Sequence, residues 1–303
     1  MWRGIRACCL LLALAANAQA ADLWEEGWIF SPIAGVAVPK LDVIYNKAFF
    51  APLAGQSELR DELPQDAQGE SAYSIVSFRI ENNLPKPGIA PEAGLEFRKN
   101  FGTRNDFIIG VSAWEIGSAG TVLTTLTLQG VADNDAIYER RAKFSYTQYF
   151  LGLRHYLRDR KQKNNFYVNA TLHEFFDLDY KETHVLEFLS GPPKGFKRVA
   201  VYQTQSTGLL LGQLGLGFER MIGSRFSFGL EAAYAKGVNR GVFRTVQARS
   251  DFNQGDRLMG PPKPLLEGPD GAAYVLGADG ESRHRLDIVL DGWRVTGKMN
   301  VAF

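Results

Sequence analysis

Charged residues recur inside segments whose neighbours alternate between apolar and polar side chains. Seven of them fall on the polar positions of that alternation: Glu96, Arg98, Arg154, Glu219, Glu231, Arg294 and Lys298. Opposite signs occur at similar depths along their segments, and an unpaired buried charge is costly. Such a set either filters solutes or fills an interior with ion pairs. Interior packing is favoured, and we expect Glu231 and Lys298 to pair directly between neighbouring strands.

Histidine and acidic residues are the remaining candidates for chemistry. The four histidines are His155, His173, His184 and His284. No H-E-x-x-H spacing occurs, and the run Asp133, Asn134 and Asp135 is too compact to form a calcium cage alone. We expect the histidines to form hydrogen bonds at a rim or in an interior, with no catalytic residue, metal or cofactor.

The first twenty residues have the features of a secretory signal. Arg3 and Arg6 precede an apolar stretch from Ala7 to Ala16, which leads to an A-x-A sequence ending at Ala20. That stretch is too short for a membrane helix, which needs ~20 apolar residues. We predict a cleaved signal over residues 1–20 and one domain over residues 21–303.

The predicted mature chain is nearly neutral and has no cysteine. Cys8 and Cys9 lie inside the signal, which excludes disulfides, thiolate metal sites and a cysteine nucleophile. Cleavage removes two of the 34 basic side chains and none of the 33 acidic ones. A nucleic-acid partner normally requires a basic surplus, so no nucleic acid is expected.

Beyond the signal, apolar residues recur mainly with period two, which is the pattern of β-strands. Each of eight segments reaches the ~9–11 residues that a tilted membrane strand requires. These segments are Trp28 to Pro39, Pro91 to Phe101, Phe107 to Ile116, Lys143 to Leu157, Asn165 to Leu178, Thr204 to Glu219, Phe226 to Lys236 and Ile288 to Phe303. The chain therefore has enough strands for a small closed barrel.

The connections between these strands alternate in length. Three are short and polar: Gly102 to Asp106, Arg158 to Asn164 and Arg220 to Arg225. Four are long: Lys40 to Ala90, Gly117 to Ala142, Asp179 to Gln203 and Gly237 to Asp287. Short turns on one rim and long loops on the other are typical of outer-membrane barrels, whose short turns face the periplasm.

Two of the long connections contain strand-like pieces, Ser71 to Glu81 and Ala272 to Leu276. We interpret them as strands that project beyond the membrane. The alternative is a ten-stranded barrel that adds Asp42 to Ala51 and Ser71 to Glu81 as a pair. It is disfavoured because these pieces are bounded by proline and alternate weakly.

The last segment shows the alternation most clearly. Its odd positions are Val295, Gly297, Met299, Val301 and Phe303, and its even positions are Arg294, Thr296, Lys298, Asn300 and Ala302. A soluble sandwich or lipocalin-like barrel would also alternate, with its apolar face inward. Glycine recurs on the polar side, at residues 94, 110, 152, 215, 217 and 229, where an eight-stranded lumen leaves little room. The glycines, the charges and the loop asymmetry together favour the membrane barrel.

The amphipathic final segment ends on Phe303, which resembles the signal read by the machinery that inserts outer-membrane barrels. By strand pattern and ending, residues 27–303 resemble the small outer-membrane barrel superfamily, which includes the transmembrane part of OmpA, OmpX, OmpW, PagP and PagL. No signature motif matches one member. The resemblance implies an all-β, transmembrane antiparallel barrel of eight strands in the outer membrane of a Gram-negative bacterium.

The same resemblance bears on function. PagL-type deacylases use a His-x-Ser arrangement, but Tyr156 and Leu157 follow His155, and Glu174 and Phe175 follow His173. A serine close in space could still complete a site. We therefore expect a non-enzymatic barrel whose loops contact lipopolysaccharide, small molecules or proteins. The alternatives are a narrow OmpW-like channel for small solutes and a lipid A modifying enzyme.

Basic residues near the predicted outer rim are the candidate lipopolysaccharide contacts, because lysine and arginine bind phosphate well. They are Arg140, Arg141 and Lys143 at one loop, Lys194, Lys197 and Arg198 at another, and Arg283 and Arg285 at a third. The competing interpretation is ordinary solvated loop charge. The pattern does not distinguish these two roles.

Overall fold

The computed structural model describes residues 27–40, 55–56, 59–60, 63, 71–84, 89–128, 133–160, 162–206, 208–252, 265–276, 283–285, 287–288 and 290–303. The predicted signal and the segment Asp42 to Ala51 lie outside the described residues. No helix in the described ranges is long and apolar enough to cross a membrane.

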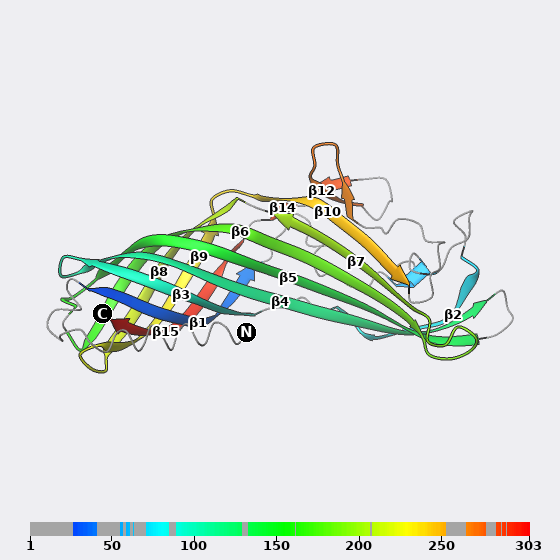
Figure 1. Cartoon of the computed structure of the whole chain (residues 1–303), viewed down its shortest axis with the longest axis horizontal. Coiled ribbons are helices and arrows are strands. Elements are labelled where there is room, and N and C mark those ends of the chain that lie inside the picture. The colour runs from blue at the N-terminus through cyan, green and yellow to red at the C-terminus, as the bar shows by residue number, and fades with distance from the viewer. Residues whose placement is uncertain are drawn as a thin grey trace.

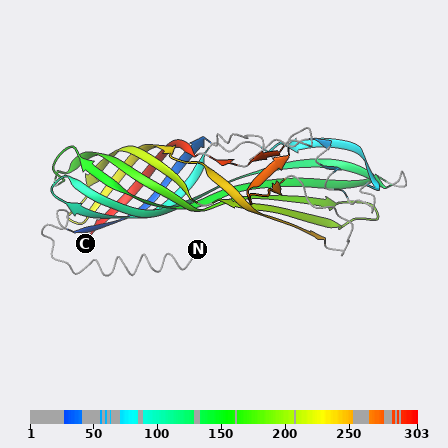
Figure 2. The same ribbon diagram turned by 90° about the horizontal axis from the view of Figure 1, so that it is seen from above.

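Eight antiparallel strands close into a ring, drawn at the left of Figures 1 and 2. In ring order they are β1 (Trp28–Lys40), β3 (Ala90–Phe101), β4 (Asn105–Leu128), β5 (Asp133–Tyr156), β6 (Asn164–Phe188), β8 (Leu209–Met221), β9 (Phe226–Gly237) and β15 (Asp291–Ala302). The first and last strands close the ring, with Val36 opposite Val295. The predicted eight-stranded barrel is confirmed.

Three ring strands continue far beyond the ring. β4 and β5 are each 24 residues long and β6 is 25, more than twice the ~9–11 residues needed to cross a bilayer. β2 (Tyr73–Asn82), β7 (Lys197–Ser206) and β10 (Gly241–Phe252) add to their outer parts. The result is an open sheet in the order β2–β4–β5–β6–β7–β10, which we call the extension (Figure 2).

The extension corrects three sequence expectations, two predicted loops and one predicted strand, and it agrees with the preference for eight ring strands over ten. The predicted loops Gly117 to Ala142 and Asp179 to Gln203 are mostly strand, because their polar residues alternate with Val, Leu and Tyr. The predicted strand Thr204 to Glu219 is two strands, β7 and β8, separated near Gly208, whose φ of 76° ends a strand. β2 lies outside the ring and pairs with β4, so it does not add a barrel strand as the ten-stranded alternative required.

A bulge in β6 marks the level where the ring gives way to the extension. Thr147 lies opposite Asp177, whereas the next residue, Gln148, lies opposite Phe175. The extra residue is Phe176, so both Phe176 and Asp177 point outward. Below the bulge the odd residues of β6 face inward, and above it the even ones do.

The remaining strands form smaller structures beside the extension. β11 (Leu265–Glu267), β12 (Ala273–Leu276) and β13 (Arg283–Arg285) make a three-stranded sheet, and β14 (Asp287–Ile288) pairs with β10. The predicted projecting piece Ala272 to Leu276 therefore contains β12, which lies outside the ring (Figure 1).

The two faces of the ring have opposite character. Large apolar side chains are exposed on its outer face, including Phe107, Leu151, Phe166, Leu216, Leu230 and Trp293. The inward positions are mostly small or polar, although a few large apolar side chains such as Ile33, Ile108 and Phe150 also point inward. At Gly110, an added Cβ would come within 2.2 Å of the Phe150 ring, so glycine makes room for a large neighbour inside. An apolar exterior around a polar, crowded interior is the reverse of a soluble barrel.

Two adjacent alanines of β9 test this assignment of faces. Ala232 points outward and is exposed, whereas Ala233 points into the ring and is 2% exposed. With Cys8 and Cys9 removed, we expect a fluorophore on Ala232→Cys to be quenched by brominated lipid. The thiol of the Ala233→Cys variant should react slowly with a maleimide fluorophore, and the fluorescence of any attached label should not be quenched by the brominated lipid. Equal labelling and equal quenching at the two positions would contradict the membrane orientation.

Candidate functional site

The lumen of the ring is filled by charged side chains of both signs. The basic members are Arg98, Arg154, Arg160, Arg294 and Lys298, and the acidic members are Glu92, Glu96, Asp106, Glu219 and Glu231. Each is at most 6% exposed. Five positive charges therefore face five negative charges in a space that leaves water little room.

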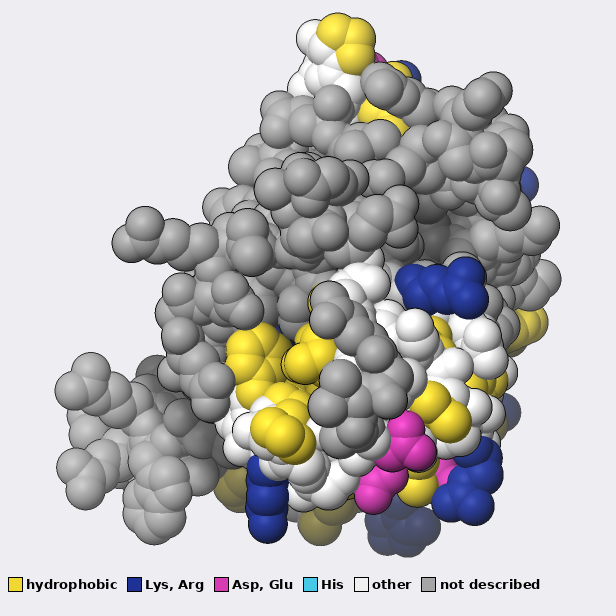
Figure 3. All heavy atoms as spheres, turned by 90° about the vertical axis from the view of Figure 1, so that its right-hand side faces the viewer, with side chains coloured by type: hydrophobic (Ala, Val, Ile, Leu, Met, Phe, Trp, Pro, Cys, Tyr) yellow, Lys and Arg dark blue, Asp and Glu magenta, His cyan; other side chains and the backbone are white. Residues whose placement is uncertain are grey.

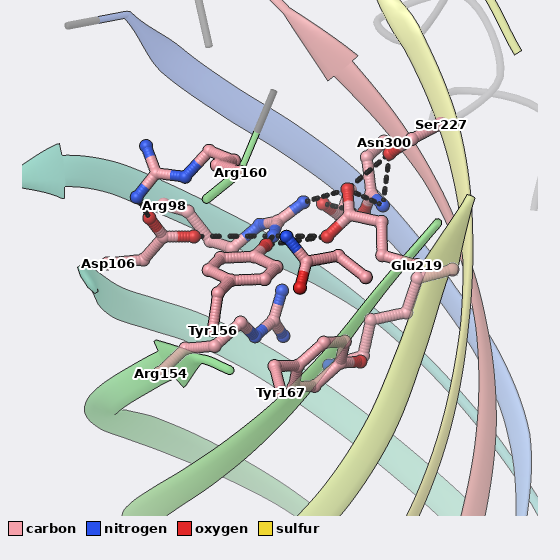
Figure 4. A network of polar contacts seen from close by, with 12 residues as sticks. Arg98, Asp106, Arg154, Tyr156, Arg160, Tyr167, Glu219, Ser227 and Asn300 are labelled. Carbon is pink, nitrogen blue, oxygen red and sulfur yellow. Dashed lines mark hydrogen bonds and ion pairs between the residues drawn. The ribbon is translucent and has the colours of Figure 1, made fainter. Parts of the chain in front are cut away.

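Arg98 of β3 organises the layer nearest the short turns (Figure 4). Its Nη1 donates to Tyr156 Oη at 2.6 Å and to Glu219 Oε2 at 3.2 Å. The Tyr156 hydroxyl donates to the same carboxylate at 2.5 Å. Asp106 adds a second acidic partner to Arg98 at 3.4 Å and also pairs with Arg160. Residues from β3, β4, β5 and β8 thus meet on one guanidinium.

Two further side chains complete this layer from the seam of the barrel. Asn300 of β15 donates to Glu219 at 2.9 Å and to Ser227 at 2.8 Å. Ser31 of β1 donates to Asn300 Oδ1 at 2.7 Å. Because β1 and β15 are the first and last strands of the ring, these bonds link the polar layer to the closure itself.

Lys298 of β15 organises the next layer. Its Nζ lies 2.7 Å from Glu96 Oε2 and 2.8 Å from Glu231 Oε2. Arg154 lies 3.0 Å from Glu96, and its guanidinium carbon lies 4.1 Å from the centroid of the Tyr167 ring. Two carboxylates and two cations therefore share the middle of the lumen, each with more than one partner.

The contact between Lys298 and Glu231 is diagonal across the hairpin. Thr296 lies opposite Glu231, and Lys298 lies opposite Gly229. The long lysine side chain spans this two-residue offset, since diagonal cross-strand neighbours are still within its reach. The structure thus brings the two predicted partners together, but not at the matching depth that the sequence suggested.

Arg294 and Glu92 belong to the third layer, toward the extension. Glu92 accepts from Ser112 at 2.6 Å and from Gln148 at 3.0 Å, and lies 3.5 Å from Arg294 Nε. Arg294 also donates to Tyr146 Oη at 2.5 Å. All seven charged residues predicted for the lumen therefore point into it.

Above this layer the lumen becomes apolar. The Tyr146 ring packs between Trp114 and Phe175, with ring centroids 4.2 Å from Trp114 and 4.4 Å from Phe175. A hollow of about 460 Å³ lies where β3 begins beside β4 and β5, and Glu92, Trp114 and Tyr146 are among the residues that line it. The hollow adjoins the polar layers, but the charged network occupies the space below it.

The histidines whose side chains are described all make polar contacts. His155 lies 2.9 Å from Asn105, and His173 lies 2.8 Å from Thr171 and 3.1 Å from Gln148. His184 lies 3.0 Å from both Glu182 and Tyr138. None of these contacts involves a serine. The side chain of His284 lies outside the described part.

A second charged group lies inside the extension. Arg140 Nη2 is 2.8 Å from Glu182 Oε1, and the Tyr180 hydroxyl donates to the same carboxylate. Burial opposes ionisation of Glu182, but the charge of Arg140 and the bond from His184 hold the pKa of that carboxyl well below its usual range. The extension therefore has its own interior, with a polar centre among aromatic side chains such as Tyr138 and Tyr202.

This interior corrects part of the predicted lipopolysaccharide surface. Arg140 and Arg198 are 6% and 1% exposed and point inward, because they occupy even positions of β5 and β7. They are not placed for surface contact. Arg141, Lys143, Lys194 and Lys197 are exposed, Arg285 is partly buried in β13, and the side chain of Arg283 lies outside the described part. Figure 3 shows basic, acidic and hydrophobic side chains mixed at the far end of the extension.

Phe303 lies at the opposite end, next to the first strand. It exchanges two backbone hydrogen bonds of 3.0 Å with Trp28 and is 40% exposed. This position fits both packing at the seam and presentation to an insertion machine. The expected assembly role stays a prediction.

Sequence reasoning missed several members of the lumen network. Asp106 and Ser112 occupy inward even positions of β4, and Tyr156 an inward even position of β5, so the alternation could have found them. Arg160 had no such signal, because it lies in a turn and folds back toward Asp106. The turn Arg158 to Asn164 therefore contributes to the lumen as well as connecting two strands.

A closed antiparallel ring with an apolar exterior and a charge-balanced interior defines this chain as a transmembrane β-barrel of the outer-membrane type. No family model and no curated protein matches the sequence.

Among solved structures, the chain is similar to the outer membrane protein OprG from Pseudomonas aeruginosa, with a TM-score of 0.32 and 11% identity over 92% of this chain and 97% of that one. The outer membrane protease OmpT from Escherichia coli gives a TM-score of 0.31 and 9% identity, over 92% of this chain and 94% of that one. A TodX deltaS2S3 mutant monoaromatic hydrocarbon channel gives a TM-score of 0.24 and 10% identity, over 96% of this chain and 94% of that one. Likenesses this distant carry no argument about function, so the class rests on the ring itself.

The middle layer of the lumen generates a stability prediction. Lys298→Met removes the cation shared by Glu96 and Glu231, and should lower the free energy of unfolding in detergent by about 3–5 kcal/mol. Adding Glu231→Gln restores the balance of charge and should recover much of that loss. Unfolding in increasing urea, followed by the fractions of folded and unfolded protein on unheated gels, measures the free energy of unfolding of the single and the double variant.

An exposed ion pair provides the matched control. Lys197 Nζ lies 3.2 Å from Glu187 with both side chains well exposed, so Lys197→Met should cost at most about 1 kcal/mol. A double variant no more stable than Lys298→Met alone would contradict the shared lumen pair.

Proposed function

We propose that the barrel is a closed, non-enzymatic anchor that holds the extension above the outer membrane, and that the extension contacts lipopolysaccharide, small molecules or other proteins. The filled lumen is the observation that supports the anchor. Its ten charged side chains are nearly inaccessible to solvent and neutralise each other, so a hydrated ion has no free path among them. This disfavours the narrow channel considered from sequence.

The length of the ring strands supports the second half of the proposal. β4, β5 and β6 pass without interruption from the ring into the extension, so the extension is held directly by the strands of the barrel. With the short turns in the periplasm, the extension lies outside the cell. We propose that a signal over residues 1–20 delivers the chain in a Gram-negative bacterium, and that Phe303 assists its insertion.

Arg141, Lys143 and Lys197 are the predicted lipopolysaccharide contacts on the extension strands β5 and β7 whose side chains remain exposed. Their side chains are 62%, 48% and 47% exposed on the outer face of the extension. Each pairs with one acidic residue, Glu139, Glu115 and Glu187 respectively, so phosphate would have to compete with these carboxylates. Lipopolysaccharide carries several phosphates together, which favours such competition.

Electrical recording tests the closed anchor. The refolded protein should show no steady conductance in planar bilayers, because the lumen network leaves no continuous water path. A parallel recording with a known open porin verifies the membrane. Steady, ion-dependent steps from the pure protein would overturn the anchor and favour the channel.

Charge removal tests the lipopolysaccharide contact. The variant Arg141→Gln/Lys143→Gln/Lys197→Gln should bind purified lipopolysaccharide several-fold more weakly than the unmodified protein in surface plasmon resonance. Removal of the lipid's phosphates should weaken binding of the unmodified protein by a similar factor. Unchanged binding in both cases would exclude these residues as the contact and leave small molecules or proteins as partners.

A further inference from the structure

Basic side chains also gather at the end of the barrel that carries the short turns. Arg104 lies in the β3–β4 turn, Arg158 and Lys163 in the β5–β6 turn, and Arg220 at the end of β8, and all four are exposed. In the described part of the β3–β4, β5–β6 and β8–β9 turns, the acidic side chain is Asp159, and the acidic residues Asp106 and Glu219 of the adjoining strand ends are buried. The rim is therefore positively charged, whereas the lumen behind it is balanced.

Three of these cations converge beside the start of β6. Asn164 lies opposite Arg220, and Met221 N donates to the carbonyl of Lys163 at 2.9 Å. The side chain of Asn165 donates to the carbonyl of Arg158 at 3.2 Å. Arg158, Lys163 and Arg220 thus form one group, the rim triad, at the end of the barrel that carries the short turns.

The rim triad borders the lipid-facing surface. Arg220 points outward and lies opposite Phe228, which is 48% exposed. Two residues before it, Phe218 packs on Phe166, with ring centroids 5.2 Å apart. Leu157 and Ile222, next to the triad in sequence, are 57% and 72% exposed. Cations directly beyond an aromatic band occupy the level of lipid headgroups.

We propose that the rim triad binds the phosphodiester headgroup of an anionic phospholipid in the periplasmic leaflet, with the acyl chains lying on the Phe166 and Phe218 surface. Three observations support this occupant: the local excess of positive charge, the outward direction of Arg220 and the adjoining apolar surface. Each cation near an anionic lipid surface strengthens binding by about fivefold. A soluble phosphate would use the charges but not the apolar surface.

Native mass spectrometry of the full protein, released from membranes of equal phosphatidylglycerol and phosphatidylcholine, tests the proposal. The unmodified protein should retain phosphatidylglycerol in preference. The variant Arg158→Gln/Lys163→Gln/Arg220→Gln should lose that preference by at least about tenfold, as expected for three cations. The charge-keeping variant Arg158→Lys/Lys163→Arg/Arg220→Lys should retain it, which separates lost charge from lost folding.

The triple variant Arg79→Gln/Lys181→Gln/Arg244→Gln, on β2, β6 and β10, is the matched control, because it removes the same charge from the extension at residues outside the proposed lipopolysaccharide contact. It should keep the phosphatidylglycerol preference. Equal loss in the two glutamine variants would show a general charge effect and overturn the site. Inorganic phosphate alone should not displace the lipid from protein in detergent; displacement would identify a phosphate site instead.

Discussion

The structure depends on closing a sheet of eight strands within lipid, which cannot form hydrogen bonds with the backbone N–H and C=O groups. Closure pairs every ring strand on both sides, and it leaves a lumen only wide enough for side chains. The period of two along each strand then places every second residue in that lumen. Because the outward residues must be apolar, the polar ones are enclosed, and their charges must cancel locally. Arg98 meets three carboxylates and Lys298 meets two for this reason.

The parts that alternation controls could be predicted from the sequence. Seven charged residues were assigned to the polar face, and all seven point into the lumen. The eight ring strands were also found, because each carries an apolar outer face. Pair geometry could not be predicted, since it depends on register: Lys298 reaches Glu231 across a two-residue offset. Arg160 escaped notice because it belongs to a turn.

The extension was harder to predict because it lies outside the membrane. Without lipid, its outer face has no need of apolar residues, so segments such as the far part of β4 look like polar loops. Arg140 and Arg198 were assigned to the surface by charge alone, although their even positions on β5 and β7 direct them inward. The break at Gly208 and the bulge at Phe176 are single-residue events that hydrophobic periodicity does not reveal.

Interior and exterior charges therefore have different tasks in this protein. Those in the lumen neutralise each other and fix eight strands around a filled centre. Those outside are available to partners, on the extension and at the short-turn rim. β4, β5 and β6 connect the two regions directly, so a contact made by the extension is held by the same strands that form the network.

Solid-state NMR of the protein in lipid tests the filled, balanced lumen most directly. With lysine labelled with ¹⁵N and glutamate with ¹³C, Lys298 Nζ should show close contacts to two ionised carboxylates, because Glu96 and Glu231 lie within hydrogen-bonding distance of it. The Glu231→Gln variant should lose one of these contacts and keep the other. A Lys298 signal that contacts water and no carboxylate would contradict the account.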